Sequence, residues 1–149
     1  MRLFKFRLEP LLRYREHLAE QAQLKVAKIR SEILGCEDRV AHLEKSYAHT
    51  AEELDQKVVS GIDAKQYKQF THFLAGIESN IESENMQRKE LLKRLEEKQK
   101  ELKQRTTDKK ALESLKNRRR EDYYQEMLKL DQKESDDMVI LRQARGVGA

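Results

Sequence analysis

The stretch Ser60-Gly61-Ile62-Asp63 interrupts a chain that otherwise has the apolar periodicity of helix for most of its length. Gly61 suits the left-handed backbone conformation that commonly closes a helix. Asp63, with Gln66 three residues later, resembles a capping box that starts a new helix. These four residues therefore predict that one helix ends, the chain turns, and a second helix begins.

Before this turn, an apolar or small side chain recurs every three or four residues. Pro10, the only proline, suits the first turn of a helix, where its missing N–H is not needed. We therefore expect a helix over about residues 9–59. Such a heptad pattern is typical of a coiled coil. We expect Leu11, Leu18 and Ala22 to continue it upstream, with a one-residue slip in register between Ala22 and Val26. The expected core positions of this helix are Val26, Ile29, Ile33, Cys36, Val40, Leu43, Tyr47 and Leu54.

After the turn, we expect a second helix over about residues 64–143, with residues 144–149 frayed. Its apolar stripe begins densely and then becomes sparse, because long basic side chains separate the leucines. Lysine and arginine can lay their methylene groups along an apolar stripe and keep the charge in water, so the helix need not stop there. The expected core positions of this helix include Leu74, Ile81, Leu95 and Leu102.

Two long helices joined by a tight turn should fold back on each other, because the apolar stripe of each needs a partner. With the turn at Gly61, residue i faces about residue 122 minus i, and the chain beyond Tyr123 has no partner helix. We therefore predict an all-α protein folded as an antiparallel two-helix coiled-coil hairpin. Residues 1–149 would form a single domain, a thin rod with its tip at residues 55–70.

The composition excludes other classes of protein. The chain has 149 residues, of which 39% are charged, with five glycines and no tryptophan. That leaves too little apolar material for a layered globular core. Cys36 stands alone and fits a reducing cytoplasm, and neither a membrane span nor a signal peptide is expected. We therefore expect a soluble, unprocessed, cytoplasmic protein.

Charge is sorted along the chain. Residues 1–30 carry eight basic and three acidic groups, residues 31–60 carry three and seven, and residues 86–120 carry fourteen and six. This pattern indicates that the two ends of the hairpin meet different partners. The run from Lys116 to Arg120 either contacts an acidic partner or is a solvated face. We expect no nucleic-acid partner, because no leucine zipper follows the basic run.

No arrangement of residues indicates catalysis. The chain lacks a glycine-rich phosphate loop, a Gly-x-Ser-x-Gly sequence and a His-Glu-x-x-His sequence. His42 and His49 share a helix face but lie about 10 Å apart, which is too far for one metal ion. We therefore expect a protein that is not an enzyme and that holds neither a metal nor another cofactor.

Aromatic and aliphatic residues crowd into three turns after the predicted turn. Placed about 100° apart per residue, they cannot all point into one two-helix seam. If Phe70, Leu74 and Ile77 fill the seam, Phe73 is left on the flank; in the alternative packing Phe70 is left out. A displayed aromatic side chain is typical of a protein contact, whereas the competing interpretation is overpacking near the turn. The crowded residues are Tyr67, Phe70, Phe73, Leu74 and Ile77.

The opening from Phe6 to His17 (Phe-Arg-Leu-Glu-Pro-Leu-Leu-Arg-Tyr-Arg-Glu-His), the Ser-Gly-Ile break and the aromatic residues after it resemble the FliJ family. FliJ is the stalk protein of the flagellar type III export apparatus, and the resemblance covers essentially the whole chain. It implies a hairpin similar to the central-stalk γ subunit of rotary ATPases. It also implies a role in flagellum biogenesis and motility through three partners: the hexameric export ATPase FliI, the export-gate protein FlhA and the export chaperones.

The resemblance also implies binding residues. An apolar pair after the turn contacts the gate protein in the family and falls here on Phe73 and Ile77, beside Tyr67 and Phe70. The end that holds both termini would enter the ATPase ring, which makes five arginines candidates for that contact. They are Arg7, Arg13, Arg118, Arg119 and Arg120.

The same resemblance places the protein in the cytoplasm, held at the inner membrane of the flagellar base by its protein partners. Two alternatives stay open. One is a stalk protein of a virulence-type III secretion system, although the Phe-Arg-Leu-Glu-Pro opening favours the flagellar branch. The other is a coiled-coil scaffold that dimerises through its second helix. We expect a monomer when the protein is free, because the apolar stripe becomes sparse after Leu91.

Overall fold

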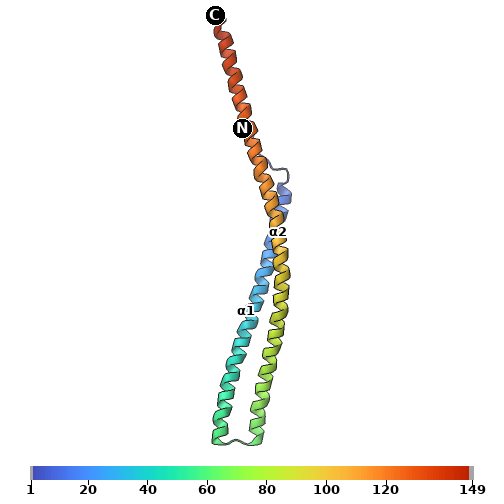
Figure 1. The fold of residues 1–149 in the computed structure, drawn as a ribbon, viewed down its shortest axis with the longest axis vertical. Coiled ribbons are helices and arrows are strands. Elements are labelled where there is room, and N and C mark those ends of the chain that lie inside the picture. The colour runs from blue at the N-terminus through green and yellow to red at the C-terminus, as the bar shows by residue number, and fades with distance from the viewer. Residues whose placement is uncertain (1, 148–149) are drawn as a thin grey trace. The chain divides into compact units, whose positions relative to one another are not determined.

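The computed structural model describes residues 2–147, which form two long helices packed antiparallel as a coiled-coil hairpin (Figure 1). Helix α1 spans Glu9–Ser60 and helix α2 spans Ala64–Val147. The predicted fold class is thereby confirmed. Helix α2 begins at the predicted residue and continues four residues past the predicted end; residues 148–149, part of the segment expected to fray, lie outside the described residues.

The turn between the helices is built as its sequence indicates. Gly61 has a φ of 92°, the left-handed region in which a side chain would be strained, and its amide donates to the carbonyl of Val58 over 3.3 Å. Asp63 then caps α2, because its Oδ1 accepts a hydrogen bond of 2.8 Å from the amide of Gln66. A glycine and an aspartate therefore reverse the chain within three residues.

The helices contribute to two compact units, and each unit is described by itself. One unit contains residues 20–103, with the turn and the parts of both helices next to it. The other contains residues 1–19 together with residues 104–149. Within each unit, residues from α1 contact residues from α2. Both termini belong to one unit, and the turn belongs to the other.

The core of the 20–103 unit is a single stripe between the helices. Ile33, Cys36 and Leu91 are buried together, and Ile29 and Leu95 pack against them. Cys36 is fully buried, which suits a small apolar side chain. The remaining core positions expected from the sequence follow the same stripe. Val26 and Leu54 are buried. The other expected positions are half-buried: Val40, Leu43, Tyr47, Leu74, Ile81 and Leu102.

Polar contacts beside the stripe show the register in which the two helices pack. Arg39 Nε lies 2.9 Å from Glu84 Oε1, and this hydrogen bond lowers the pKa of Glu84. The hydroxyl of Tyr47 donates to Glu78 over 3.0 Å, which raises the pKa of Tyr47. Such exposed pairs add little stability because water and salt screen them. With the turn at Gly61, the sequence predicts that Arg39 faces about residue 83 and that Tyr47 faces about residue 75. The observed partners, Glu84 and Glu78, lie one and three residues further along α2.

In the other unit, the stripe runs through Leu12 and Ala19, which are buried. The upstream prediction is wrong at Leu11, which is exposed. Leu18 is half-buried, and Ala22, in the 20–103 unit, is buried. Leu12, Ala19 and Val26 are seven residues apart, so the heptad spacing holds without a slip in register. The small side chain of Ala19 occupies the seam where a leucine was expected, and the leucine beside it lies on the flank.

The residues before α1 fold onto α2 within the same unit. Phe6 is buried and its carbonyl accepts a hydrogen bond from the amide of Glu9. The ring of Phe4 lies 5.6 Å from that of Tyr123, whose hydroxyl donates to the carbonyl of Arg2. This segment therefore anchors the start of the chain to α2.

Burial at the seam should control stability. Replacing Leu91, which is 5% exposed, by alanine should lower the free energy of unfolding by about 2–4 kcal/mol, because it leaves a cavity between the helices. Its neighbour Leu92 is 43% exposed, so Leu92→Ala should cost under about 1 kcal/mol. Urea unfolding followed by circular dichroism measures both, and equal losses would contradict the assignment of the seam.

Candidate functional site

The turn end of the hairpin displays aromatic side chains, as the sequence indicates. From here on, the tip, predicted from the sequence at residues 55–70, denotes residues 55–77. Phe70 and Leu74 are half-buried against α1, and Ile77 is 5% exposed. Phe73 is 54% exposed on the flank of α2. Of the two packings considered from the sequence, the structure has the one in which Phe73 lies outside the seam.

A cation–π contact joins the two helices near the turn. The Nζ of Lys57, in the last turn of α1, lies 5.1 Å from the centre of the Phe70 ring on α2. Phe70 is thus covered by the opposite helix. The contact explains why Phe70, which the sequence grouped with the candidate gate-contact residues, is less accessible than its neighbours Tyr67 and Phe73.

The structure separates the pair Phe73 and Ile77. Ile77 faces α1 in the interior of the hairpin, so a partner reaches it only if the helices part. Phe73 is accessible in the closed hairpin, together with Tyr67 and the last residues of α1, Val58 and Val59. The tip therefore offers a partner exposed apolar side chains around an intact seam, and its exposed aromatic residues on α2 are Tyr67 and Phe73.

The five candidate arginines all belong to the unit that contains both termini, and all are exposed. They come from the start of the chain and from α2, which the fold brings into that unit. Arg120 lies 5.9 Å from the ring of Tyr124, and Arg118 and Arg120 line a shallow hollow beside that ring. Arg13 lies 4.0 Å from Glu9, a weak pairing that leaves its charge available.

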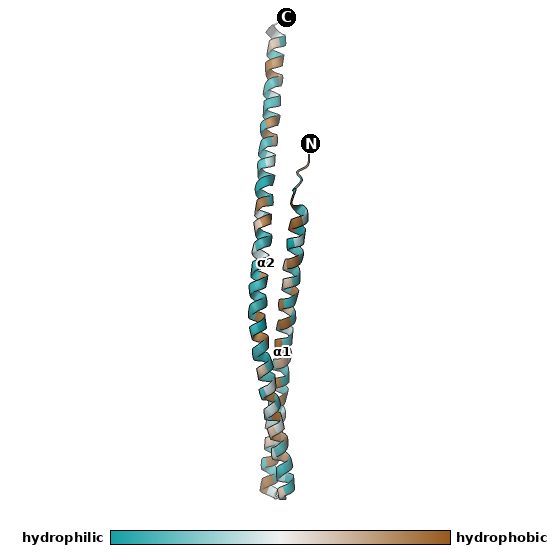
Figure 2. Ribbon diagram, turned by 90° about the vertical axis from the view of Figure 1, so that its right-hand side faces the viewer, coloured by the Kyte–Doolittle hydropathy of each residue, from teal (hydrophilic) through white to brown (hydrophobic). Residues whose placement is uncertain are grey.

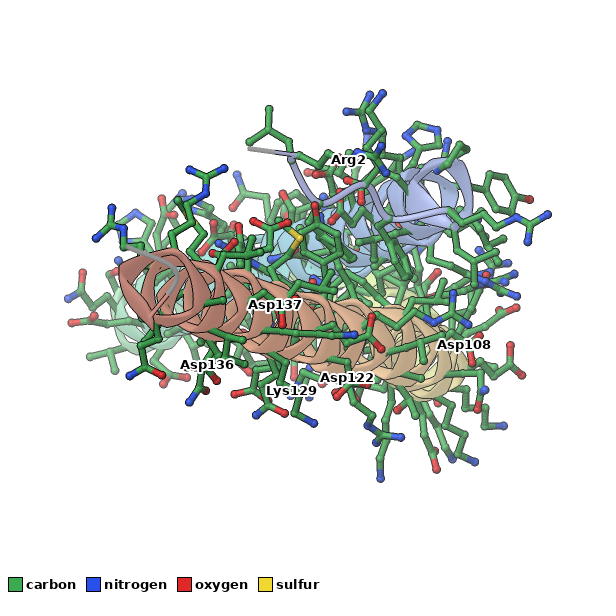
Figure 3. All side chains as sticks on the ribbon, turned by 90° about the horizontal axis from the view of Figure 1, so that it is seen from above. Arg2, Asp108, Asp122, Lys129, Asp136 and Asp137 are labelled. Atoms are coloured by element: carbon green, nitrogen blue, oxygen red, sulfur yellow. The ribbon has the colours of Figure 1, made fainter. Side chains whose placement is uncertain are left out.

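The later part of α2 has no partner helix, as predicted for the chain beyond Tyr123. Every residue from 128 to 146 is exposed. Apolar bands recur there (Figure 2), the last of them at residues 138–141. Charged side chains seven residues apart share one side of α2, along this stretch and just before it, as Asp122, Lys129 and Asp136 show (Figure 3). The four consecutive apolar residues at 138–141 already mark this exposed apolar band in the sequence, but no binding role was predicted for them.

Within residues 2–147, no group of three or more metal-binding side chains comes together. Cys36 is buried, and its sulfur lies 3.3 Å from Nη2 of Arg39. In the same range, neither helix contains an apolar run long enough to cross a membrane.

Comparisons with known proteins agree with this picture. A family model described as "Flagellar FliJ protein" matches residues 4–148. A solved structure, that of a putative YscO homolog from Chlamydia trachomatis, is similar to this chain with a TM-score of 0.50 and 16% sequence identity. The match covers 93% of this chain and 94% of that one, and at this identity it shows a shared fold. No curated protein matches the sequence.

Two substitutions should separate the roles of the paired residues. Ile77→Ala should lower the free energy of unfolding by about 2–4 kcal/mol, because it empties a buried position of the seam. Phe73→Ala should change it by no more than about 0.5 kcal/mol, because the ring lies mostly in solvent. Thermal and urea unfolding test both variants. A large loss for Phe73→Ala would mean that this ring packs within the hairpin.

Proposed function

The chain belongs to the FliJ family of flagellar proteins, and on this premise we propose that it is a stalk and adaptor that binds two partners of the type III export apparatus. The family is a non-catalytic component of that apparatus. In this proposal, the tip contacts the membrane export-gate protein FlhA, and the unit with both termini contacts the hexameric export ATPase FliI. The protein also helps to escort export chaperones.

The observation that carries the proposal is the exposed ring of Phe73 beside a closed seam. An exposed aromatic side chain on a charged helix leaves apolar surface in water, and such residues commonly anchor protein interfaces. The hairpin does not need this ring for its own packing, because Phe70, Leu74 and Ile77 supply the seam. A contact with the gate protein through Phe73 explains why the ring is there.

The exposed arginines support the second contact. An export ATPase ring that presents carboxylates would pair with them, and guanidinium groups suit such bidentate contacts. By touching several subunits, the stalk would stabilise the assembled ring without hydrolysing nucleotide itself. Linking the ring to the gate in this way would hold the protein on the cytoplasmic side of the inner membrane at the flagellar base.

The alternatives are less well supported. The flagellar family model covers residues 4–148, which favours the flagellar apparatus over a virulence-type secretion system. A scaffold that dimerises through α2 would need a free apolar stripe on that helix. In the hairpin, the stripe of α2 at Ile77 and Leu91 is already buried against α1. This use of the stripe argues against a dimer formed through that part of α2, whereas the exposed apolar residues at 138–141 stay available to a partner.

The gate contact is tested by capturing the purified cytosolic part of the gate protein with the full chain. Phe73→Ala should reduce the amount captured at least about tenfold, as expected for an interface anchor. Tyr14, which is 56% exposed in the other unit, provides the matched control, and Tyr14→Ala should bind normally. Undiminished capture by Phe73→Ala would remove the tip from the interface.

The ring contact has its own test. Replacing Arg118, Arg119 and Arg120 together by alanine should weaken the chain's effect on assembly of the export ATPase hexamer by about tenfold in apparent affinity. The difference between the wild-type chain and the triple variant should become smaller as the salt concentration is raised, since salt screens exposed charges. Light scattering of the ATPase, mixed with the wild-type or altered chain, measures assembly. A triple variant that promotes assembly as well as the wild type would refute this contact.

A further inference from the structure

The far end of α2 carries an apolar band that the hairpin leaves uncovered. We call residues 138–141 the band, and each of these four side chains is more than half exposed. Every residue from 128 to 146 is exposed, because α1 begins only at Glu9 and does not extend along this part of α2. A single helix without a packed face is only marginally stable in water. This part of α2 would therefore gain stability from a partner.

A second apolar surface lies about 16 Å before the band along α2. The segment ahead of α1 is joined to α2 by the hydrogen bond from Tyr123, and a groove runs beside that contact. Leu3 lines this groove from the segment, and Leu128 and Leu130 line it from α2. These three leucines are exposed, Leu3 by 84%. Asp131 adds a carboxylate to the lining, so the groove is apolar with an acid beside it.

The groove and the band share one face of α2. Leu130, Glu134, Met138, Leu141 and Arg145 follow steps of four, four, three and four residues. This spacing places them along one side of the helix. A second helix that lies along this side can therefore touch the groove and the band together.

Charge is divided between the two surfaces. Residues 121–137 carry seven acidic and two basic groups, whereas residues 138–147 carry Arg142 and Arg145 and no acid. Within residues 2–147, no ion pair involves any of these groups. The groove is therefore on an acidic stretch and the band on a basic one, and the charges of both stretches are unpaired.

We propose that two copies of this chain pair through residues 124–145 of α2, antiparallel and related by a two-fold axis. Leu141 of each copy lies in the groove of the other copy, close to Leu130, and Arg142 lies opposite Asp131. Because the interface is two-fold, the same contact forms twice. This inference goes beyond the proposed function and does not depend on it.

The order of the two surfaces along α2 favours a second copy of the chain as the occupant. A reversed copy of the same helix brings a basic band onto an acidic groove at both ends at once. A parallel copy would instead place acid against acid and base against base, which is unfavourable. The segment is thus complementary to itself in the antiparallel direction alone.

The pairing is expected to be weak. With Arg142 opposite Asp131, the two-fold axis passes near Asp136 and Asp137, where the carboxylates of the two copies repel each other. The paired segment is also short, about 30 Å of helix. We expect a dissociation constant on the order of tens of micromolar, as for other small interfaces. At lower concentration the chain is then the monomer that the sequence predicts.

Sedimentation equilibrium of the full chain tests the pairing, because it measures mass independently of shape. The mass should rise from that of one chain towards that of two as the concentration increases. Leu141→Gln should weaken association at least about tenfold, because it puts a polar group into the groove. Leu24, which is 69% exposed in the 20–103 unit, provides the matched control, and Leu24→Gln should associate normally.

A pair of charge variants tests the antiparallel register. One variant carries Asp131→Lys and Glu134→Lys, and the other carries Arg142→Glu and Arg145→Glu. Each variant alone should associate at least about tenfold more weakly, because like charges then meet at both contacts. An equimolar mixture should associate about as well as the wild type, because both contacts again join opposite charges. All four positions are exposed, so the hairpin itself should keep its helical circular dichroism.

A matched charge control carries Lys89→Glu and Lys93→Glu, at exposed positions of α2 in the 20–103 unit, and should associate normally. A wild-type chain that stays monomeric at about ten times the expected dissociation constant would refute the proposal. Association that persists in both charge variants would place the contact on another surface and refute it too. If the wild type is monomeric and Leu141→Gln loses binding to the export ATPase, the band belongs to that partner and the dimer is rejected.

Discussion

Burial of one narrow apolar stripe between α1 and α2 is the interaction on which the rest of the molecule depends. More than a third of the residues are charged, and neither helix has a second apolar face with which to fold alone. Ile33, Cys36 and Leu91 show the consequence, because each is buried only where the other helix covers it. In proteins, most of the stability of a helix comes from packing of its apolar face and not from helix propensity, so contact across the seam provides most of the stability.

The same constraint explains why function must lie on the outer surface. A two-helix hairpin has room for one seam, so any large apolar or aromatic residue beyond that seam is displayed. Phe73 is displayed at the tip in this way. The later part of α2 is displayed for a different reason: α1 begins only at Glu9 and therefore does not extend along it. A protein built like this displays apolar and charged side chains along exposed helix faces, which suits the proposed role of an adaptor.

The turn and most of the seam could be predicted because they depend on local chemistry. Gly61 and Asp63 determine the reversal through a positive φ and a helix cap, and heptad spacing identifies one face of a helix. The face is defined only to within about one residue, which is why Leu11 was expected where Leu12 lies. Pattern alone could not assign Phe73 and Ile77 to different sides, because their accessibility depends on where α1 crosses. The division into two units also depends on contacts between residues distant in sequence.

The central claim, that the chain doubles back at Gly61 to close this seam, is tested most directly by a distance between the helices. Spin labels at Leu34→Cys and Leu92→Cys, both exposed positions, can be measured by pulsed electron resonance in a Cys36→Ala background. The measurement should be made with excess unlabelled chain, so that only distances within one molecule contribute. The hairpin predicts a distance below about 30 Å, since packed helices lie about 10 Å apart and the labels add their own length. A continuous helix would place these residues about 87 Å apart, and the absence of a short distance would contradict the account.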